Sequence, residues 1–255
     1  MKIKYFITLL LSVFLFACDN ESNNSSVSIR LTDAPSEYEA VWVDIQGIEI
    51  HFTTESGDGQ WIALENINKG LYNLLDYSNG KDTLLISTDI SSGNISQIRL
   101  ILGDQNSLVT AEGTFPLVIP SGSTSGLKFN LHETLEPGIT KNIWIDFDAS
   151  KSIVKSGNGS YQLKPVIRAY TESTSGAIKG FVNPKASLPT IYAILGSDTL
   201  STIADTSGYF MIGGTPEGTY TVKFAPVQPY LSLTIDGVQV VNGEYTDLGT
   251  VNISQ

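Results

Sequence analysis

Alternation of apolar and polar residues, repeated in short runs along most of the chain, is the feature that most constrains the fold. Val41-Trp-Val-Asp-Ile45 and Ile143-Trp-Ile-Asp-Phe147 are two such runs, with an apolar residue at every second position. Successive side chains of a strand point to opposite faces, so each run predicts a strand with one buried face. Clusters of Gly, Ser, Asn and Asp separate the runs, as at residues 56–59, 91–94, 121–123 and 156–159. The pattern predicts an all-β protein of antiparallel sandwiches or barrels.

The runs form two groups, separated by the short polar segment 172–176. The first group predicts a β-sandwich over residues 27–172. The second group covers residues 176–255 and contains about seven short runs, which is the spacing of an immunoglobulin-like sandwich. The sequence therefore predicts two β-sandwich domains joined by a short linker.

Residues 1–17 have the pattern of a secretory signal peptide. Lys2 and Lys4 form a positive head, and the apolar run that follows is shorter than the about 20 residues of a membrane-spanning helix. Leu15-Phe-Ala-Cys18 resembles a lipobox, and Cys18 is the only cysteine, so it cannot form an internal disulfide. We expect cleavage before Cys18 and lipid attachment to its sulfur. The alternative is ordinary secretion with an incidental cysteine.

Residues 18–26 are polar and have no hydrophobic period, which predicts a flexible tether. Two or more acyl chains anchor a protein stably to a membrane, so the expected location is the cell envelope, at the outer membrane. Removal of residues 1–17 leaves 13 basic and 26 acidic residues, a net charge of −13. Such a surface repels nucleic acid, which we therefore exclude as a partner.

Four segments of the first group carry a family resemblance. They are Leu31-Thr-Asp-Ala-Pro35, Gly126-Leu-Lys128, Asp146-Phe-Asp-Ala-Ser-Lys-Ser-Ile-Val154 and the run Gly157–Arg168. Together they resemble the domain-of-unknown-function 4382 family, which occurs in bacterial cell-surface lipoproteins. The resemblance implies a fold and a location, and the family has no assigned activity.

The second group resembles the carboxypeptidase regulatory-like (transthyretin-like) family. The residues that carry the resemblance are Gly180, Asp205-x-x-Gly208-x-Phe210, Gly218-x-Tyr220-x-Val222 and Asp247-Leu-Gly-Thr-Val251. The resemblance implies a carbohydrate-binding-like fold. The acidic and aromatic ligand residues usual in that family are not recognisable here, so a spacer role is expected for this domain.

The chain has few residues suited to catalysis. His51 and His132 are the only histidines, and the alternation places both on polar strand faces, where a solvated surface role is expected. The sequence has no Gly-x-Ser-x-Gly elbow and no Cys or His cluster with zinc-ligand spacing. We predict a protein that is not an enzyme and that uses no cofactor and no metal.

Two strands offer a candidate ligand site. Trp42 and Asp44 share the face opposite the apolar one, as do Trp144, Asp146 and Asp148 on the second strand. An indole ring can stack on the C–H face of a sugar, and carboxylates accept hydrogen bonds from its hydroxyl groups. The alternative is that both tryptophans pack inside the protein and that the aspartates cap turns, with Asp148 as the N-cap of a short helix.

Asp33, in the Thr-Asp-Ala-Pro segment, has the same two interpretations. A turn-forming role is the ordinary one for an aspartate at this position, and a ligand role is the alternative.

These features predict a lipid-anchored, non-enzymatic envelope protein that binds or displays something at the cell surface, with a polysaccharide as the expected ligand. The first alternative is a structural or adhesin subunit whose strand edges pair with an envelope protein. The second is a carboxylate-dependent hydrolase that uses Asp146 and Asp148, or Asp44.

Overall fold

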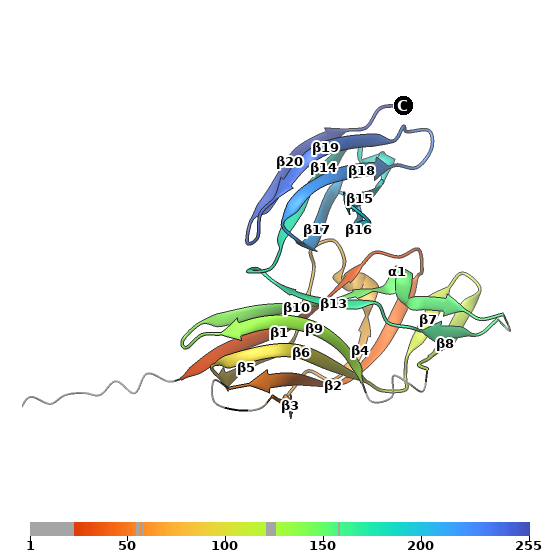
Figure 1. Ribbon diagram of the computed structural model, residues 1–255. Coiled ribbons are helices and arrows are strands. Elements are labelled where there is room, and N and C mark those ends of the chain that lie inside the picture. The colour runs from red at the N-terminus through yellow and green to blue at the C-terminus, as the bar shows by residue number, and fades with distance from the viewer. Residues whose placement is uncertain (1–22, 55–56, 58, 121–125, 158) are drawn as a thin grey trace, which may run out of the picture.

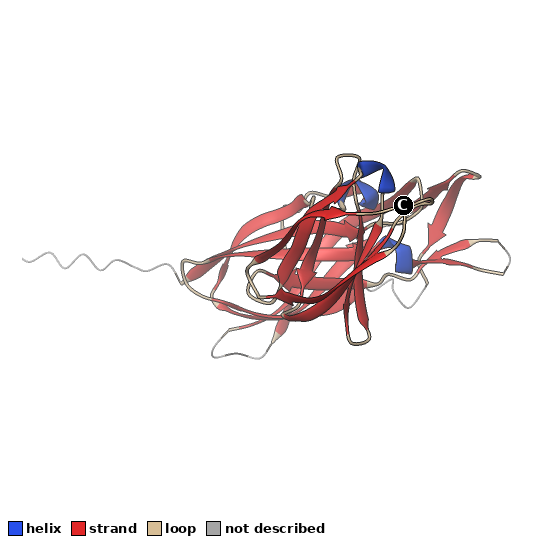
Figure 2. Ribbon diagram, turned by 90° about the horizontal axis from the view of Figure 1, so that it is seen from above, coloured by secondary structure: helices blue, strands red, loops and turns tan. Residues whose placement is uncertain are grey.

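The computed structural model describes residues 23–54, 57, 59–120, 126–157 and 159–255. Strands dominate this part of the chain, with short helical turns only (Figures 1 and 2), which confirms the predicted all-β class. None of the described helices has the length and apolar character needed to cross a membrane. The predicted signal peptide, Cys18 and residues 19–22 of the predicted tether lie outside the described residues.

One wall of the first domain is a four-stranded sheet in the order β13-β10-β1-β5. Its strands are β1 (Asn24–Ala34), β5 (Thr83–Ser91), β10 (Thr140–Asp148) and β13 (Ile167–Thr171). β1 pairs in parallel with β10, whereas the other two pairs are antiparallel. The expectation of a purely antiparallel arrangement was wrong at this pair, because alternation determines which face of a strand is buried but not the direction of its neighbour.

The other wall is a nine-stranded sheet in the order β11-β12-β8-β7-β2-β6-β9, with β3 and β4 added on β2. Its strands are β2 (Ala40–Thr53), β3 (Gln60–Ala63), β4 (Gly70–Asn73), β6 (Gly93–Leu102), β7 (Ser107–Thr110), β8 (Gly113–Val118), β9 (Leu127–Leu135), β11 (Ile153–Lys155) and β12 (Tyr161–Leu163). Its inner face packs on that of the first sheet. The core between them includes Ile29, Ile45, Ile145 and Phe147, all fully buried.

Two short helical turns flank these sheets. The 3-10 turn η1 (Leu74–Tyr77) follows β4, and α1 (Ala149–Ser152) follows β10. The Asp148 carboxylate accepts a 3.0 Å hydrogen bond from the backbone N–H of Lys151, which confirms Asp148 as the predicted N-cap. α1 therefore begins directly at the end of the strand that carries Trp144 and Asp146.

The second domain has two sheets, in the orders β17-β14-β20 and β16-β15-β18-β19. Its elements are β14 (Gly176–Asn183), η3 (Lys185–Ser187), β15 (Thr190–Leu195), β16 (Asp198–Ile203), β17 (Tyr209–Thr215), β18 (Gly218–Ala225), β19 (Leu233–Val240) and β20 (Tyr245–Asn252). They enclose a separate core in which Phe210 and Phe224 meet edge to face, with ring centroids 5.5 Å apart. This domain lies over the side of the first domain that contains β10 and β13 (Figure 1).

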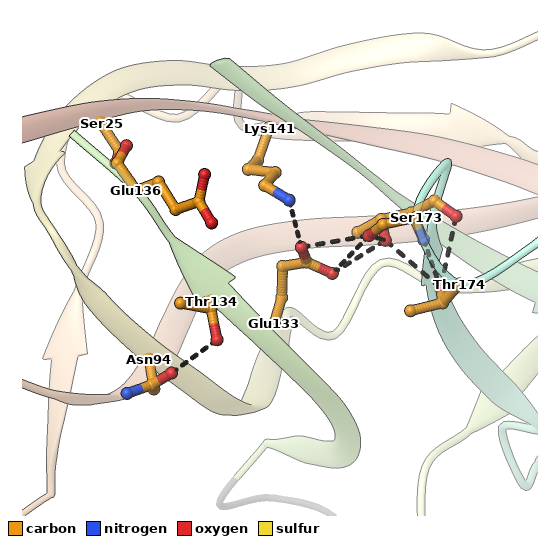
Figure 3. Close-up of polar contacts among 9 residues, drawn as sticks. Ser25, Asn94, Glu133, Thr134, Glu136, Lys141, Ser173 and Thr174 are labelled. Carbon is orange, nitrogen blue, oxygen red and sulfur yellow. Dashed lines mark hydrogen bonds and ion pairs between the residues drawn. The ribbon is translucent and has the colours of Figure 1, made fainter. Parts of the chain in front are cut away.

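A buried carboxylate holds the linker between the domains. Glu133 of β9 is 6% exposed and forms an ion pair with Lys141 at 2.6 Å, and it accepts hydrogen bonds from Thr171 and Ser173 at 2.9 and 3.0 Å. Figure 3 shows Glu133 between Lys141 on one side and the linker residue Ser173 on the other. The linker therefore leaves the first domain in a fixed direction, because its hydroxyl groups are bonded to a side chain of that domain.

Asn79, in the loop between η1 and β5, bonds the first domain to the edge of β17. Its side-chain oxygen accepts a 2.6 Å hydrogen bond from the Met211 N–H, and its Nδ2 donates to the Tyr209 carbonyl at 3.1 Å. The side-chain amide thus pairs with β17 much as a neighbouring strand would. Backbone groups at this edge, which would otherwise be open to another chain, are covered.

Asn79→Ala should loosen this contact. The loss of its hydrogen bonds to Tyr209, Met211 and Thr202 should lower the free energy of unfolding by about 1–3 kcal/mol. It should also speed amide exchange at Met211, measured by hydrogen–deuterium exchange. Asn66→Ala is the matched control, because Asn66 is exposed and has nearly the same left-handed backbone, with φ 60° against 58° for Asn79. Equal exchange at Met211 in both variants would contradict the role given to Asn79.

Candidate ligand cavity between the domains

A cavity of about 410 Å³ lies between the two domains. The first domain contributes Asp33, Trp144, Asp146 and Tyr170 to its lining, and the second contributes Met211 and Tyr245, among others. Its volume falls within the about 300–1,000 Å³ typical of sites for small molecules. Of the predicted site residues, Trp144, Asp146 and Asp148 all line this cavity, whereas Trp42 and Asp44 do not.

Trp144 is fixed in the cavity wall by its neighbours. Its ring stacks on Tyr170, with an interplanar angle of 10° and centroids 5.6 Å apart. Its Nε1 donates a 2.8 Å hydrogen bond to Asp82, and the other oxygen of Asp82 accepts from Arg30 at 2.9 Å. The ring therefore packs against Tyr170, as the second interpretation expected, and it also lines the cavity; the ligand role of Trp144 stays a prediction.

Asp146 is paired with a cation that reaches both domains. It is 8% exposed, and its Oδ2 accepts a 2.7 Å hydrogen bond from Nε of Arg168 on the neighbouring strand β13. The two other nitrogens of Arg168 donate to the carbonyls of Gly213 and Gly214 in the second domain. A Cβ on Gly214, where φ is +59°, would lie 2.4 Å from the Tyr170 ring, so only glycine permits this approach.

Asp148 is also paired. Its Oδ2 lies 2.8 Å from the Lys151 ammonium, one turn along α1. Burial opposes ionisation, but hydrogen bonds from Lys151 and Ser150 outweigh that effect and hold the pKa of Asp148 below its usual value. The carboxylate is therefore ionised and neutralised by its own helix.

Asp33 is a buried acid of the cavity that forms no ion pair with a described residue. It lies within β1, not in the turn expected for it, and is 5% exposed. Its Oδ1 accepts a 2.9 Å hydrogen bond from the Ala149 N–H, whereas its Oδ2 is buried with no hydrogen-bond partner among the described residues. Burial, reinforced by the nearby charges of Asp146 and Asp148, raises the pKa of Asp33 well above its ordinary value, although the Ala149 bond opposes the shift.

Trp42 and Asp44 lie on β2, in the nine-stranded sheet, away from the cavity. Asp44 is 4% exposed, and its oxygens accept hydrogen bonds from the Gln46 side chain and from the Gln105 N–H, the latter at 3.3 Å. Its own N–H donates to the Asn106 side chain at 2.9 Å. Asp44 therefore stabilises the loop between β6 and β7 through hydrogen bonds to Gln105 and Asn106.

Neither histidine reaches the cavity. His51 bonds Ser96 at 2.8 Å and meets the Trp61 ring edge to face, and His132 is exposed at a residue with positive φ. In the part of the chain that the structure describes, no group of three or more His, Cys, Asp or Glu residues could hold a metal ion.

The sequence did not identify several other lining residues, among them Asp82, Arg168, Tyr170 and Tyr245. Arg168 and Tyr170 alternate with apolar residues as Trp144 and Asp146 do, so the same period-two pattern could have marked their strand. Asp82 and Tyr245 lie beside β5 and in β20, and only the folded arrangement brings them to the cavity.

The family model described as "Domain of unknown function (DUF4382)" matches residues 24–165. These residues form most of the first domain and include Asp33, Trp144, Asp146 and Asp148. No curated protein matches the chain. The resemblance of the second domain to the transthyretin-like family stays a prediction.

Three solved structures illustrate the likeness to known folds. A type II cohesin–X-dockerin complex from Acetivibrio cellulolyticus matches with 25% identity, over 31% of this chain and 56% of that chain, with a TM-score of 0.26. The minor pilin GBS52 of Streptococcus agalactiae matches with 9% identity over 89% of this chain and 95% of its own, with a TM-score of 0.24. The shaft pilin SpaA of Lactobacillus rhamnosus GG matches with 10% identity over 91% and 96%, with a TM-score of 0.23. At TM-scores this low, no function is transferred to this chain.

Asp33→Asn should change how stability depends on pH. In the wild type, the folded chain keeps the Asp33 proton as the pH rises past the ordinary pKa of 3.8, whereas the unfolded chain loses it. The free energy of unfolding should therefore fall, relative to that of Asp33→Asn, by about 1.4 kcal/mol per pH unit between pH about 4 and the folded pKa.

Asparagine keeps the oxygen that accepts from Ala149, so the variant should fold. The measurement is thermal denaturation of both proteins from pH 4 to 8. Parallel curves across this range would show that Asp33 is not held protonated in the folded chain.

Proposed function

The chain belongs to the DUF4382 family, whose description states no function, and we propose that it is a lipid-anchored, non-enzymatic envelope protein that binds a polysaccharide segment between its two domains. The observation that carries the proposal is the cavity of about 410 Å³, to which both domains contribute aromatic and acidic side chains. It is large enough for one or two sugar units. Its lining offers aromatic rings that can stack on a sugar and carboxyl groups that can accept hydrogen bonds from its hydroxyl groups.

The lining contains both aromatic and polar side chains. Trp144 and Tyr245 offer ring surface for the C–H faces of a sugar, and Tyr170 stacks on the Trp144 ring. Asp33, Glu172 and Glu244 offer carboxyl oxygens for its hydroxyl groups. Sites that recognise small polar ligands typically combine apolar walls with a few such directed polar groups.

An aromatic path continues from the cavity along the outer face of the β17-β14-β20 sheet. Tyr245, at the cavity, is 63% exposed, and Phe181, further along, is 47% exposed. Phe181 packs on Tyr209 with ring centroids 5.4 Å apart. A row of rings that extends beyond one cavity suits a chain of sugars better than a single small molecule, and it gives the second domain a role beyond that of a spacer.

The pairing of the acids supports a binding role over hydrolysis. Glycoside hydrolysis needs one carboxyl group as an acid and a second carboxylate as a base or nucleophile. Asp146 is bonded to Arg168, and Asp148 is bonded to Lys151 and caps α1. Both carboxylates are therefore engaged with cations of their own domain and are not free to exchange protons with a substrate.

An anchor at Cys18 would place β1 close to the membrane. β1 begins at Asn24, so at most about 20 Å of chain separates a lipid on Cys18 from the first sheet. Asp33 lies near the other end of the same strand, about 30 Å further on. A lipid at Cys18 would thus hold the first domain near the membrane with the cavity on its far side.

Cys18→Ser should abolish the anchor. The wild type, expressed in a bacterium and labelled with an alkyne fatty acid, should carry the label and partition with membranes. The variant should lose the label and keep residues 1–17, because cleavage before the cysteine follows lipid attachment. Intact mass measures both effects, and equal labelling of the two proteins would refute the anchor.

Tyr245→Ala should weaken polysaccharide binding at least about tenfold without lowering the melting temperature, because the side chain is mostly exposed yet lines the cavity. Binding is measured on a glycan array and by calorimetry. Leu231→Ala is the control, since Leu231 is 57% exposed in the same domain but does not line the cavity. Failure of the wild type to bind any glycan would overturn the proposal in favour of a protein partner.

A further inference from the structure

We propose that this cavity selects saccharides that carry a protonated amino group, and that Asp33 is the residue that receives the ammonium. The inference rests on the proposed polysaccharide site and names its ligand class. Rings and acids bind many sugars, whereas a charged contact with one buried carboxyl group distinguishes amino sugars from neutral ones.

Asp33 has the one unsatisfied buried carboxyl oxygen among the described acids of the cavity. Its Oδ2 is buried and accepts no hydrogen bond from any described residue, whereas Oδ1 is bonded to the Ala149 N–H. An unsatisfied buried polar atom is costly, and burial keeps Asp33 protonated in the free protein. A donor can bond fully to this oxygen only when it displaces that proton, as a cationic group does.

The charge balance around Asp33 specifies a cationic donor. The nearby carboxylates, Asp146 and Asp148, are each neutralised by one cation of the first domain, Arg168 and Lys151. Asp33 has no such partner among the described residues. The lining also contains Glu172, Glu244 and one further cation, Lys81, none of which forms an ion pair with a described residue, so the acids still outnumber the cations. An ammonium group restores neutrality, whereas a uronate or sulfated sugar would add repulsion.

Other ligand groups fit this position less well. A neutral hydroxyl can bond to Asp33 but leaves the acid protonated and the excess negative charge uncompensated. A divalent cation such as Ca²⁺ needs six to eight oxygen ligands, and no described cluster of acids has that form.

Binding of an ammonium should release a proton. In the free protein, burial raises the pKa of Asp33, and the charges of Asp146 on β10 and Asp148 at the start of α1 raise it further. Arg168 on β13 and Lys151 on α1 are bonded to those two acids and not to Asp33. A cation beside Asp33 favours its ionised form, so affinity should rise with pH until either Asp33 is ionised in the free protein or the amino group of the ligand loses its proton.

The test compares two oligosaccharides that differ only at the amino group. At a pH below the pKa of their amino groups, β-1,4-linked glucosamine oligomers carry an ammonium at each unit, and N-acetylglucosamine oligomers of the same length carry a neutral amide. The full chain should bind the glucosamine oligomer at least about tenfold more tightly, as expected for one charge-assisted hydrogen bond in a buried site. Asp33→Asn should bring the ratio of the two affinities close to one.

Asp104→Asn is the matched control, because it makes the same charge change at an exposed residue that does not line the cavity. It should leave the ratio at the wild-type value. A second measurement needs the wild type alone: calorimetry in two buffers of different ionisation enthalpy should detect proton release on binding of the glucosamine oligomer and none with the N-acetyl oligomer.

Different outcomes would refute the polysaccharide site and the ammonium contact at Asp33. If the wild type binds neither these oligomers nor any glycan on an array, the polysaccharide site itself is refuted. If it binds both oligomers equally, releases no proton, or keeps its preference in Asp33→Asn, the site stands and the assignment of the ammonium to Asp33 is overturned.

Discussion

The contact of the Arg168 guanidinium with both domains is the interaction on which the cavity depends. Its Nε donates to Asp146 at 2.7 Å, while its other nitrogens donate to the carbonyls of Gly213 and Gly214. Because a guanidinium is planar and its donors point in fixed directions, these bonds set the position of β17 relative to β10. They help to hold the acids of the first domain and Tyr245 of the second around one cavity.

Polar contacts at the interface specify orientation, and the two apolar cores provide stability. Burying Asp146 costs desolvation free energy, which Arg168 offsets, and an apolar pair of similar size could be as stable. An apolar pair would not fix a direction, however. Asn79 also fixes a direction, because its side-chain amide bonds to two defined backbone groups of β17. Glu133 adds a third directional contact at the linker.

Alternation in the sequence predicts strands and the side chains that share a face, which is why Trp144, Asp146 and Asp148 were expected together and line one cavity. Trp42 and Asp44 have the same local pattern but belong to the other sheet, because a period of two carries no information about which strands become neighbours. Asp33 could not be identified from its motif alone. Its burial arises from α1 and β10, which lie more than 100 residues further along the chain.

A ligand that meets Asp33 and Tyr245 at once would contact both domains. It would bind only when the domains are in the arrangement that Arg168 and Asn79 hold, so binding and domain orientation are thermodynamically linked. A saccharide in the cavity would therefore stabilise the interface between the domains. The free energy of this stabilisation equals the gain in saccharide-binding free energy that the formed interface provides. A saccharide chain long enough to reach Phe181 would extend this linkage along the second domain.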